Sequence, residues 1–145
     1  MALKAAIHQY LATRDGVTSL VPAARIFRGR RTANTALPSI TYWRISEVDE
    51  NHQEAACGKA QARIQFDVWA ATDSGAEAIW SALRTALHWM NNTSIGSGGD
   101  ATWIDKIECE NTMDIHDWPQ DASDVHVYQI SMDAMIVYRT SVPTF

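Results

Sequence analysis

Cysteine is scarce in this chain of 145 residues, which contains only Cys57 and Cys109. Two cysteines so far apart form neither a metal-type pair nor a dense disulfide framework. The N-terminal segment also lacks the apolar core and small-residue cleavage site of a secretory signal, and no apolar run is long enough to cross a bilayer. We therefore expect a protein that is cytosolic when made, with free thiols and no membrane partner.

Basic residues are few as well, because 12 Lys and Arg stand against 17 Asp and Glu, for a formal net charge of -5. Phosphate binding depends on clustered Lys and Arg, so this balance excludes a broad nucleic-acid-binding surface. The cluster RGRR at residues 28–31 is a local exception. A basic motif this short is typical of a solvated loop beside a strand.

Motifs that carry catalysis are missing from the sequence. There is no nucleophile elbow, no dinucleotide fingerprint and no phosphate-cradling loop. The glycine-rich residues 96–100 precede a predicted strand, so they lack the helix N-terminus that binds phosphate. We predict no cofactor and no enzymatic activity.

The five histidines show no His-x-x-x-His spacing and no close Cys/His cluster. The nearest metal-binding candidate is the segment DIHDW, with Asp114, His116 and Asp117. A polar loop with such residues is usually just solvated. A small metal-dependent hydrolase that uses these three side chains stays open as the enzymatic alternative.

Asp67 and Asp133 are predicted to share the polar face of a sheet, where they could form a pair of carboxylates. A catalytic pair needs a cleft that raises the pKa of one member, and an open sheet face offers none. Ordinary hydration, or pairing with Arg44 or Arg63, suffices to explain both carboxylates.

Two segments show the apolar periodicity of helices. In the first, the apolar face consists of Leu3, Ala6, Ile7, Tyr10 and Leu11, and Asp15-Gly16 is predicted to end the helix. In the second, Ser74 and Glu77 fit a capping box, and the apolar stripe consists of Ile79, Trp80, Leu83, Leu87 and Met90. The glycine-rich residues 94–100 that follow are predicted to be a flexible loop without core contacts.

Alternating residues predict strands at 36–46, 59–71, 101–111 and 125–139, with a short extended piece near 24–29. The clearest core faces are Ala62, Ile64, Phe66 and Val68 in one strand and Tyr128, Ile130, Met132, Ala134, Ile136 and Tyr138 in the last. The order of elements predicts one α+β domain over residues 1–145: a mostly antiparallel or mixed sheet of four to five strands, with two helices packed on one face.

Three of the tryptophans, Trp43, Trp69 and Trp103, are predicted on the sheet face opposite the helices. Aromatic side chains are enriched in the cores of protein interfaces, so this face is a candidate contact surface. A partial second core covered by loops explains the same pattern, and both interpretations stay open.

Four segments in their order along the chain resemble the tail completion, or tail-to-head joining, proteins of long-tailed bacteriophages and prophages. They are RIFRGR, LPSITYWRIS, ARIQFDVWAATDSGAEAIWSALRTAL and the terminal VYQISMDAMIVYR. Each motif is short, so the specificity lies in their joint order, which spans nearly the whole chain. The connections at 92–101 and 112–124 depart from the usual pattern, which leaves their role unassigned.

The resemblance implies a non-enzymatic virion component at the junction of tail and head, present in the host cytoplasm before assembly. Its expected partners are copies of itself in a ring, as a hexamer, the tail tube protein, and the head completion or connector protein. DNA would pass through the ring without specific binding. A head-completion or neck protein of the same connector, and a small binding module, are the alternative functions.

A cyclic ring needs two different complementary patches on each subunit. We hypothesise that Trp43, Arg44 and Trp69 contribute to contacts with a neighbouring subunit or the tube. We also expect residues 46–58, with Glu47, Asp49 and Glu50, to form a projecting arm that becomes ordered on assembly. The acidic balance suits a channel that repels the phosphates of passing DNA.

Overall fold

The computed structural model describes residues 2–29, 36–51, 56–117 and 127–140. The helices are α1 (Ala2–Ala12), α2 (Asp15–Thr18) and α3 (Asp73–Leu87), with short 3-10 turns at Ala23–Arg25 and Gly98–Asp100. The strands are β1 (Ile26–Arg28), β2 (Ser39–Asn51), β3 (Ala56–Ala70), β4 (Asn91–Ile95), β5 (Thr102–Asp117) and β6 (Val127–Arg139).

These strands form one sheet in the order β1-β2-β3-β6-β5-β4. Only β1 and β2 are parallel, and all other neighbours are antiparallel. The prediction of an α+β fold with a mixed sheet is confirmed. The predicted number of four to five strands is wrong, because the sheet has six strands.

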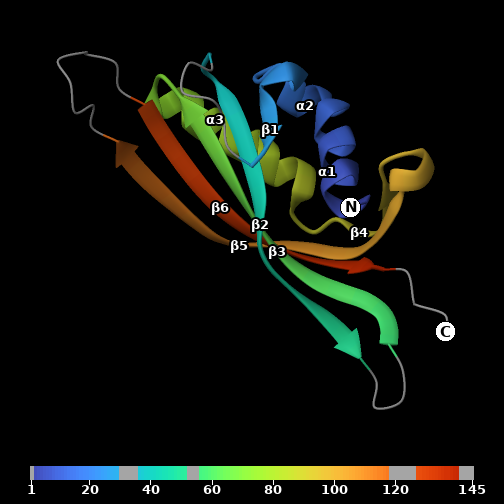
Figure 1. The fold of residues 1–145 in the computed structure, drawn as a ribbon. Helices are drawn as coiled ribbons and strands as arrows, with labels where there is room; N and C mark the ends of the chain where they lie inside the picture. The colour runs from blue at the N-terminus through green and yellow to red at the C-terminus, as the bar shows by residue number, and fades with distance from the viewer. Residues whose placement is uncertain (1, 30–35, 52–55, 118–126, 141–145) are drawn as a thin grey trace.

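The helices cover one face of the sheet, which we call the helix face, and none of the described helices lies on the other, the open face (Figure 1). The predicted core positions lie on the helix face and are buried there, except Tyr128, which is partly buried against the core. Phe66 of β3, for example, is fully buried and its ring packs 5.7 Å from the ring of Tyr42 in β2. The alternation of apolar residues in β3 and β6 therefore correctly predicted which face of the sheet packs against the helices.

Helix α3 begins differently from the prediction. The side chain of Thr72, rather than Ser74, accepts a hydrogen bond from the backbone N–H of Gly75 and caps the helix. The capping box was wrong by two residues because several neighbouring polar side chains fit the same pattern. The predicted apolar stripe is confirmed in Ile79, Leu83 and Leu87.

The prediction of a flexible loop at residues 94–100 is wrong. Ile95 at the end of β4 is only 4% exposed, and the backbone at Gly96 lies so close to Ala6 that a Cβ atom there would clash with it. Gln9 of α1 accepts a hydrogen bond from the backbone N–H of Ser97 and donates one to Asp100. Gly96 therefore permits close packing of this segment against α1.

The polar segments that were expected to be loops are largely strand. β2 continues through the acidic residues to Asn51, and β5 continues to Asp117, so both hairpins reach past the helices at opposite ends of the sheet (Figure 1). The expectation of an arm that is ordered only on assembly is therefore wrong for residues 46–51, which pair with β3 in the isolated chain. Residues 52–55 and 118–126 lie outside the described residues.

Candidate interaction surfaces

The open face carries a network of ion pairs instead of an apolar patch. Asp105 of β5 pairs with Lys59 at 3.1 Å and with Arg139 at 3.5 Å. Arg63 of β3 lies 3.2 Å from Glu110 and 3.8 Å from Asp133. These pairs span β3, β6 and β5, so long charged side chains cover the sheet where no helix does.

The pKa of the Asp105 carboxyl group reflects the charges of this network. Partial burial acts to raise the pKa of its carboxyl group, but the hydrogen bond and charge of Lys59, the Trp103 indole N–H and the charge of Arg139 hold that pKa below its usual value. The network is therefore ionised and internally neutralised, which is typical of structural pairing and not of a catalytic acid.

Asp67 and Asp133 do not form a carboxylate pair. Asp67 lies opposite Ser131 in the register and accepts its hydroxyl hydrogen bond at 2.6 Å, together with bonds from Gln65 at 3.0 and 3.2 Å. Asp133 lies opposite Gln65 and pairs with Arg63. Each carboxylate thus has its own partners, and the pairing predicted between Arg63 and this face is confirmed for Asp133.

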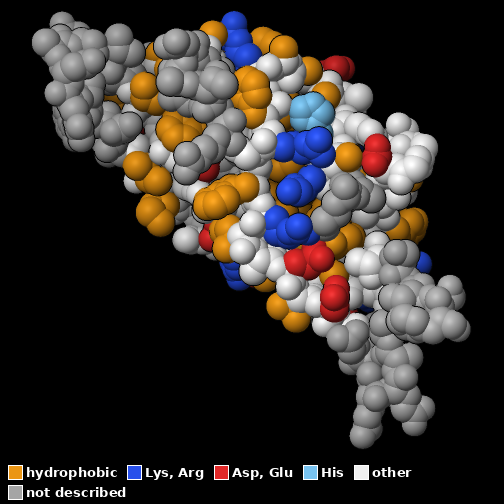
Figure 2. Space-filling view, viewed as in Figure 1, with side chains coloured by type: hydrophobic (Ala, Val, Ile, Leu, Met, Phe, Trp, Pro, Cys, Tyr) orange, Lys and Arg blue, Asp and Glu red, His pale blue; other side chains and the backbone are white. Residues whose placement is uncertain are grey.

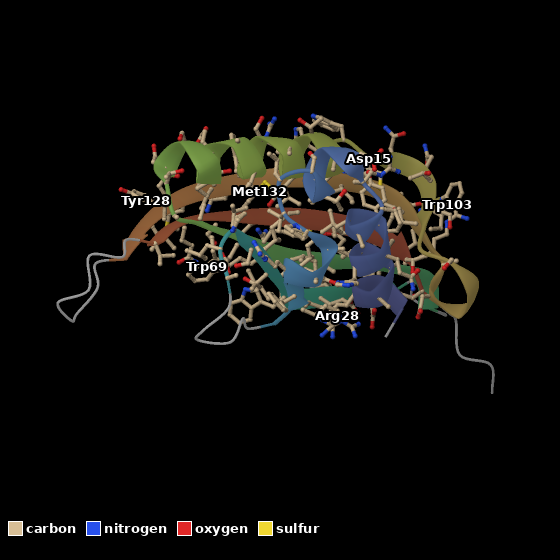
Figure 3. All side chains as sticks on the ribbon, turned by 90° about the horizontal axis from the view of Figure 1, so that it is seen from above. Asp15, Arg28, Trp69, Trp103, Tyr128 and Met132 are labelled. Atoms are coloured by element: carbon tan, nitrogen blue, oxygen red, sulfur yellow. The ribbon has the colours of Figure 1, made fainter. Side chains whose placement is uncertain are left out.

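The three tryptophans of the open face do not all lie together. Trp43 is 50% exposed near the edge of the sheet, whereas the indole N–H of Trp69 donates to the hydroxyl of Thr41 at 3.0 Å. Trp103 donates to Asp105 and lies under the guanidinium group of Arg139. Figure 3 shows Trp69 and Trp103 at opposite ends of the molecule. They do not form one contact patch.

A β-bulge divides the other predicted site residues between the two faces. The register of β2 against β3 shifts between Arg44 and Ser46, so Glu47 lies opposite Ala62 and Asp49 opposite Ala60, on the helix face. Arg44 lies on the same face opposite Ile64 and pairs with Glu47 at 3.2 Å. Trp43, Trp69 and Glu50 belong to the open face. An extra residue in one strand reverses the alternation that sequence reasoning extrapolates.

The end of β2 is held to the sheet by its acidic side chains. The hydroxyl of Tyr138 in β6 donates to the Glu47 carboxylate across β3, and Glu50 accepts a hydrogen bond from Gln61 at 3.1 Å. Burial and the adjacent Glu47 carboxylate both raise the pKa of the Tyr138 hydroxyl. The residues from Ile45 to Asp49 are nevertheless exposed, because no described helix covers this part of the sheet.

At each outer edge of the sheet the last strand is shorter than its neighbour and pairs with only part of it. β1 pairs only with Ile40–Tyr42, so from Trp43 onward β2 has no described strand on its outer side. β4 pairs only with the stretch from Thr102 to Lys106 of β5, and from Glu110 to Asp114 β5 is exposed and has no described strand beyond it. We call these the β1–β2 edge and the β4–β5 edge.

Figure 2 shows Lys and Arg side chains in a row beside β1 and β2, with acidic side chains following toward the β2–β3 hairpin. Arg28, at the end of β1, is exposed and points away from the sheet (Figure 3). The opposite edge carries exposed carboxylates, Glu110 and Asp114. The β1 end of one edge is therefore basic, and the open end of β5 at the other edge is acidic.

The sequence analysis did not single out several exposed or half-buried apolar residues at these edges, among them Phe27, Trp89 and Met113. Trp89 is 62% exposed just after α3, and its backbone N–H donates to the carbonyl of Ile107 in β5. Met113 is 54% exposed on β5. Trp89 follows a helix, Met113 lies in a segment predicted as a loop, and Phe27 lies in a short extended piece, so their position at an edge follows only from the strand order.

Metal and thiol chemistry receive no support from the described part of the chain. It contains no group of three or more His, Cys, Asp and Glu side chains placed to hold a metal ion. Asp114 is exposed on β5, and the side chains of His116 and Asp117 lie outside the described residues. The imidazole Nδ1 of His88 accepts from the backbone N–H of Cys109, and burial raises the pKa of the Cys109 thiol to about 11. None of the described helices is both long and apolar enough to cross a membrane.

The family described as Tail completion protein gp17 matches residues 5–102, the part that runs from α1 to the start of β5. The chain belongs to this family. The resemblance stated from the sequence motifs is thereby confirmed. The match covers the whole of β1, β2, β3 and β4, so it includes one complete edge of the sheet.

The fold also matches a chain in a solved structure titled "Virion of native gene transfer agent (GTA) particle". The TM-score is 0.70 at 14% sequence identity, and 95% of each chain is covered. At this identity the likeness establishes the fold alone. A search of curated proteins gave no match.

Proposed function

We propose that this tail completion protein is a non-enzymatic structural subunit that caps the phage tail tube and joins it to the head connector as part of a ring. The observation that carries this proposal is the family match over residues 5–102, because tail completion is a step of virion assembly. The fold shared with a chain of a virion particle supports it over 95% of both chains. Its location would be the junction of tail and head, after synthesis in the host cytoplasm.

The surfaces agree with an assembly role. In the described residues charged side chains of the open face pair with one another, and no group of three or more His, Cys, Asp and Glu side chains is placed to hold a metal ion. Exposed apolar side chains, among them Trp43, Val48 and Met113, lie on β2 and β5 where these strands have no described outer neighbour. Edge strands with unpaired backbone groups pair readily with another chain.

The expected partners are copies of this chain in a ring, which we expect to be a hexamer, the tail tube protein and the head completion or connector protein. DNA would cross the ring without specific binding. Glu47, Asp49 and Glu50 at the β2 end are suited to a channel wall, since carboxylates repel phosphates. A ring structure in which all three lie away from the channel would remove this part of the proposal.

The test is electron microscopy of a lysate from a phage or prophage that lacks this protein. The proposal predicts tails that are over-long or not joined to heads, and rescue by the wild-type chain. Heads that have lost their DNA, beside tails of normal length, would instead assign the chain to head completion. Particles of normal appearance would contradict both assignments.

A further inference from the structure

The geometry points to head-to-tail pairing of copies of this chain through the β1–β2 edge of one copy and the β4–β5 edge of the next, so that the sheets continue from subunit to subunit. This inference rests on the proposed ring and specifies which surfaces close it. It follows from the register, the charges and the exposed side chains of the two edges.

At each of the two edges the outermost strand covers only part of its neighbour, and the two uncovered parts lie at different positions along the strand direction. Through the paired strands, Phe27 of β1 is level with Thr41, Asp67, Ser131 and finally Met113 of β5. β1 thus protrudes from one edge at the height where the opposite edge is open.

The same relation holds at the other end of the sheet. Thr93 of β4 is level with Ile104, Tyr138, Ala60 and finally Asp49 of β2. β4 protrudes where β2 is open. If two copies lie side by side at the same height, each protruding strand lies beside the uncovered part of the other copy's edge.

The strand directions allow both new pairings. β6 runs parallel to β2, because both are antiparallel to β3, and β5 runs opposite to them. β1 of one copy would therefore pair antiparallel with β5 of the next, and β4 of that copy would pair parallel with β2 of the first. Both arrangements form regular backbone hydrogen-bond ladders.

Where β1 of one copy would pair with β5 of the next, the facing side chains are complementary. Phe27 is half-buried and Met113 is 54% exposed, and they are level, so a thioether would meet an aromatic ring. Arg28 follows Phe27, and Asp114 follows Met113, both on the helix face and both exposed. In an antiparallel pair they would be diagonal neighbours, within reach of a long side chain.

Charge also disfavours the symmetric alternative. Pairing two β2 edges with each other would bring Glu47, Asp49 and Glu50 against their own copies. Pairing two β5 edges would bring Glu110 and Asp114 together in the same way. Like charges directly opposite one another are destabilising in a sheet, whereas β4 presents Asn91, Asn92, Thr93 and Ser94 to the acidic β2 end. The favoured contact is heterologous, as a ring requires.

The test exchanges the charges of Arg28 on β1 and Asp114 on β5, the two residues proposed to meet between copies. Arg28→Glu and Asp114→Arg, each alone, should raise the protein concentration needed for ring formation at least tenfold, as measured by mass photometry with tube ends present when needed. The double variant should restore most of the wild-type assembly. Glu77→Arg and Arg84→Glu, both exposed on α3, are matched controls that should assemble as the wild type does. Circular dichroism and thermal unfolding of every variant confirm that it is folded.

A second experiment tests by disulfide cross-linking whether Phe27 of one copy lies beside Met113 of the next. The background is the chain with Cys57→Ser and Cys109→Ala. Phe27→Cys with Met113→Cys should give a ladder of cross-linked copies under oxidising conditions, and Met113→Cys alone should not. Within one chain the two positions are separated by four strand spacings, roughly 19 Å, which is too far for a disulfide.

The outcomes separate this inference from the proposed function. Rings that form normally in both single charge variants, or a double variant no better than the singles, would overturn the edge pairing while leaving the ring intact. A wild-type chain that stays monomeric even with tube ends would overturn the ring, and the edge pairing with it.

Discussion

The middle of the sheet and its two ends differ in the interactions that stabilise them. In the middle, α1 and α3 cover the helix face, and side chains such as Phe66 and Met132 are fully buried (Figure 3). Toward the ends, residues 45–49 of β2 and 110–114 of β5 are exposed, and the β2–β3 hairpin continues past the helices. The middle is stabilised by burial of apolar surface, whereas the ends keep regular strand pairing without a core. The difference predicts that substitutions at the ends change the stability of the chain less than substitutions in the middle do.

The largest effect should come from a truncation in the middle. Phe66→Ala removes a fully buried ring that packs on Tyr42, so we expect a loss of about 3–5 kcal/mol in the free energy of unfolding. Urea denaturation measures it. Met113→Ala at the end of β5 is the comparison, with an expected change within about 0.5 kcal/mol. Equal losses at both sites would contradict the division into middle and ends.

Alkaline pH should destabilise the middle through Tyr42. Burial raises the pKa of the Tyr42 hydroxyl, with the charge of Arg28 acting in the opposite direction. A raised folded-state pKa favours the protonated form, so its contribution to stability is complete below the unfolded pKa, near 10, and is lost as the pH rises toward the folded value. Unfolding free energy should fall by about 1.4 kcal/mol per pH unit for such a tyrosine.

Denaturation series between pH 8 and pH 11.5 measure this slope, and Tyr42→Phe is the matched variant. It should be less stable at pH 8, since the hydroxyl of Tyr42 donates to the Lys4 carbonyl at 2.9 Å, and should show a shallower alkaline decline. A decline that is the same in both proteins would show that Tyr42 does not cause it.

The cap of α3 should have a smaller effect. Thr72→Ala removes the hydrogen bond to the Gly75 N–H and should cost about 1 kcal/mol of unfolding free energy. Ser74→Ala, two residues on, should change stability by less than about 0.5 kcal/mol. The reverse order of these two losses would restore Ser74 as the cap.

The smallest effect on stability should come from the ends. Asp49→Ser in β2, where the side chain is exposed, should change the unfolding free energy by no more than about 0.5 kcal/mol. Thermal unfolding of the monomer at low concentration is the appropriate measurement. A loss of several kcal/mol would show that the hairpin end supports the core after all.

The sequence predicted the middle better than the ends for a physical reason. Burial imposes alternation, so Ile64, Phe66 and Ile136 could be placed on the helix face from their spacing alone. The β2 bulge could not be foreseen, because it depends on the register against β3, and it places Glu47 and Asp49 on the helix face within a strand that continues past the predicted end at residue 46. At residues 94–100, glycine and serine predict a loop locally, but tertiary contacts with Ala6 and Gln9 fix them in place.

The candidate interface shows the same limit. Trp43 was correctly identified as an exposed aromatic residue, since alternation placed it opposite the core, but Trp69 is tied to Thr41 within the chain. Phe27, Trp89 and Met113 come from three separate segments, and their position at the edges follows only from the strand order. An edge is a property of topology, and no local pattern in a strand reports it.

Backbone hydrogen exchange in the monomer and in the assembled ring tests the central claim most directly. The account predicts fast exchange at the outward-facing amides of residues 45–50 and 110–115 in the monomer, and strong protection of both stretches in the ring, while the amides of β3 stay protected in both states. Rings in which both stretches exchange as fast as in the monomer would contradict it.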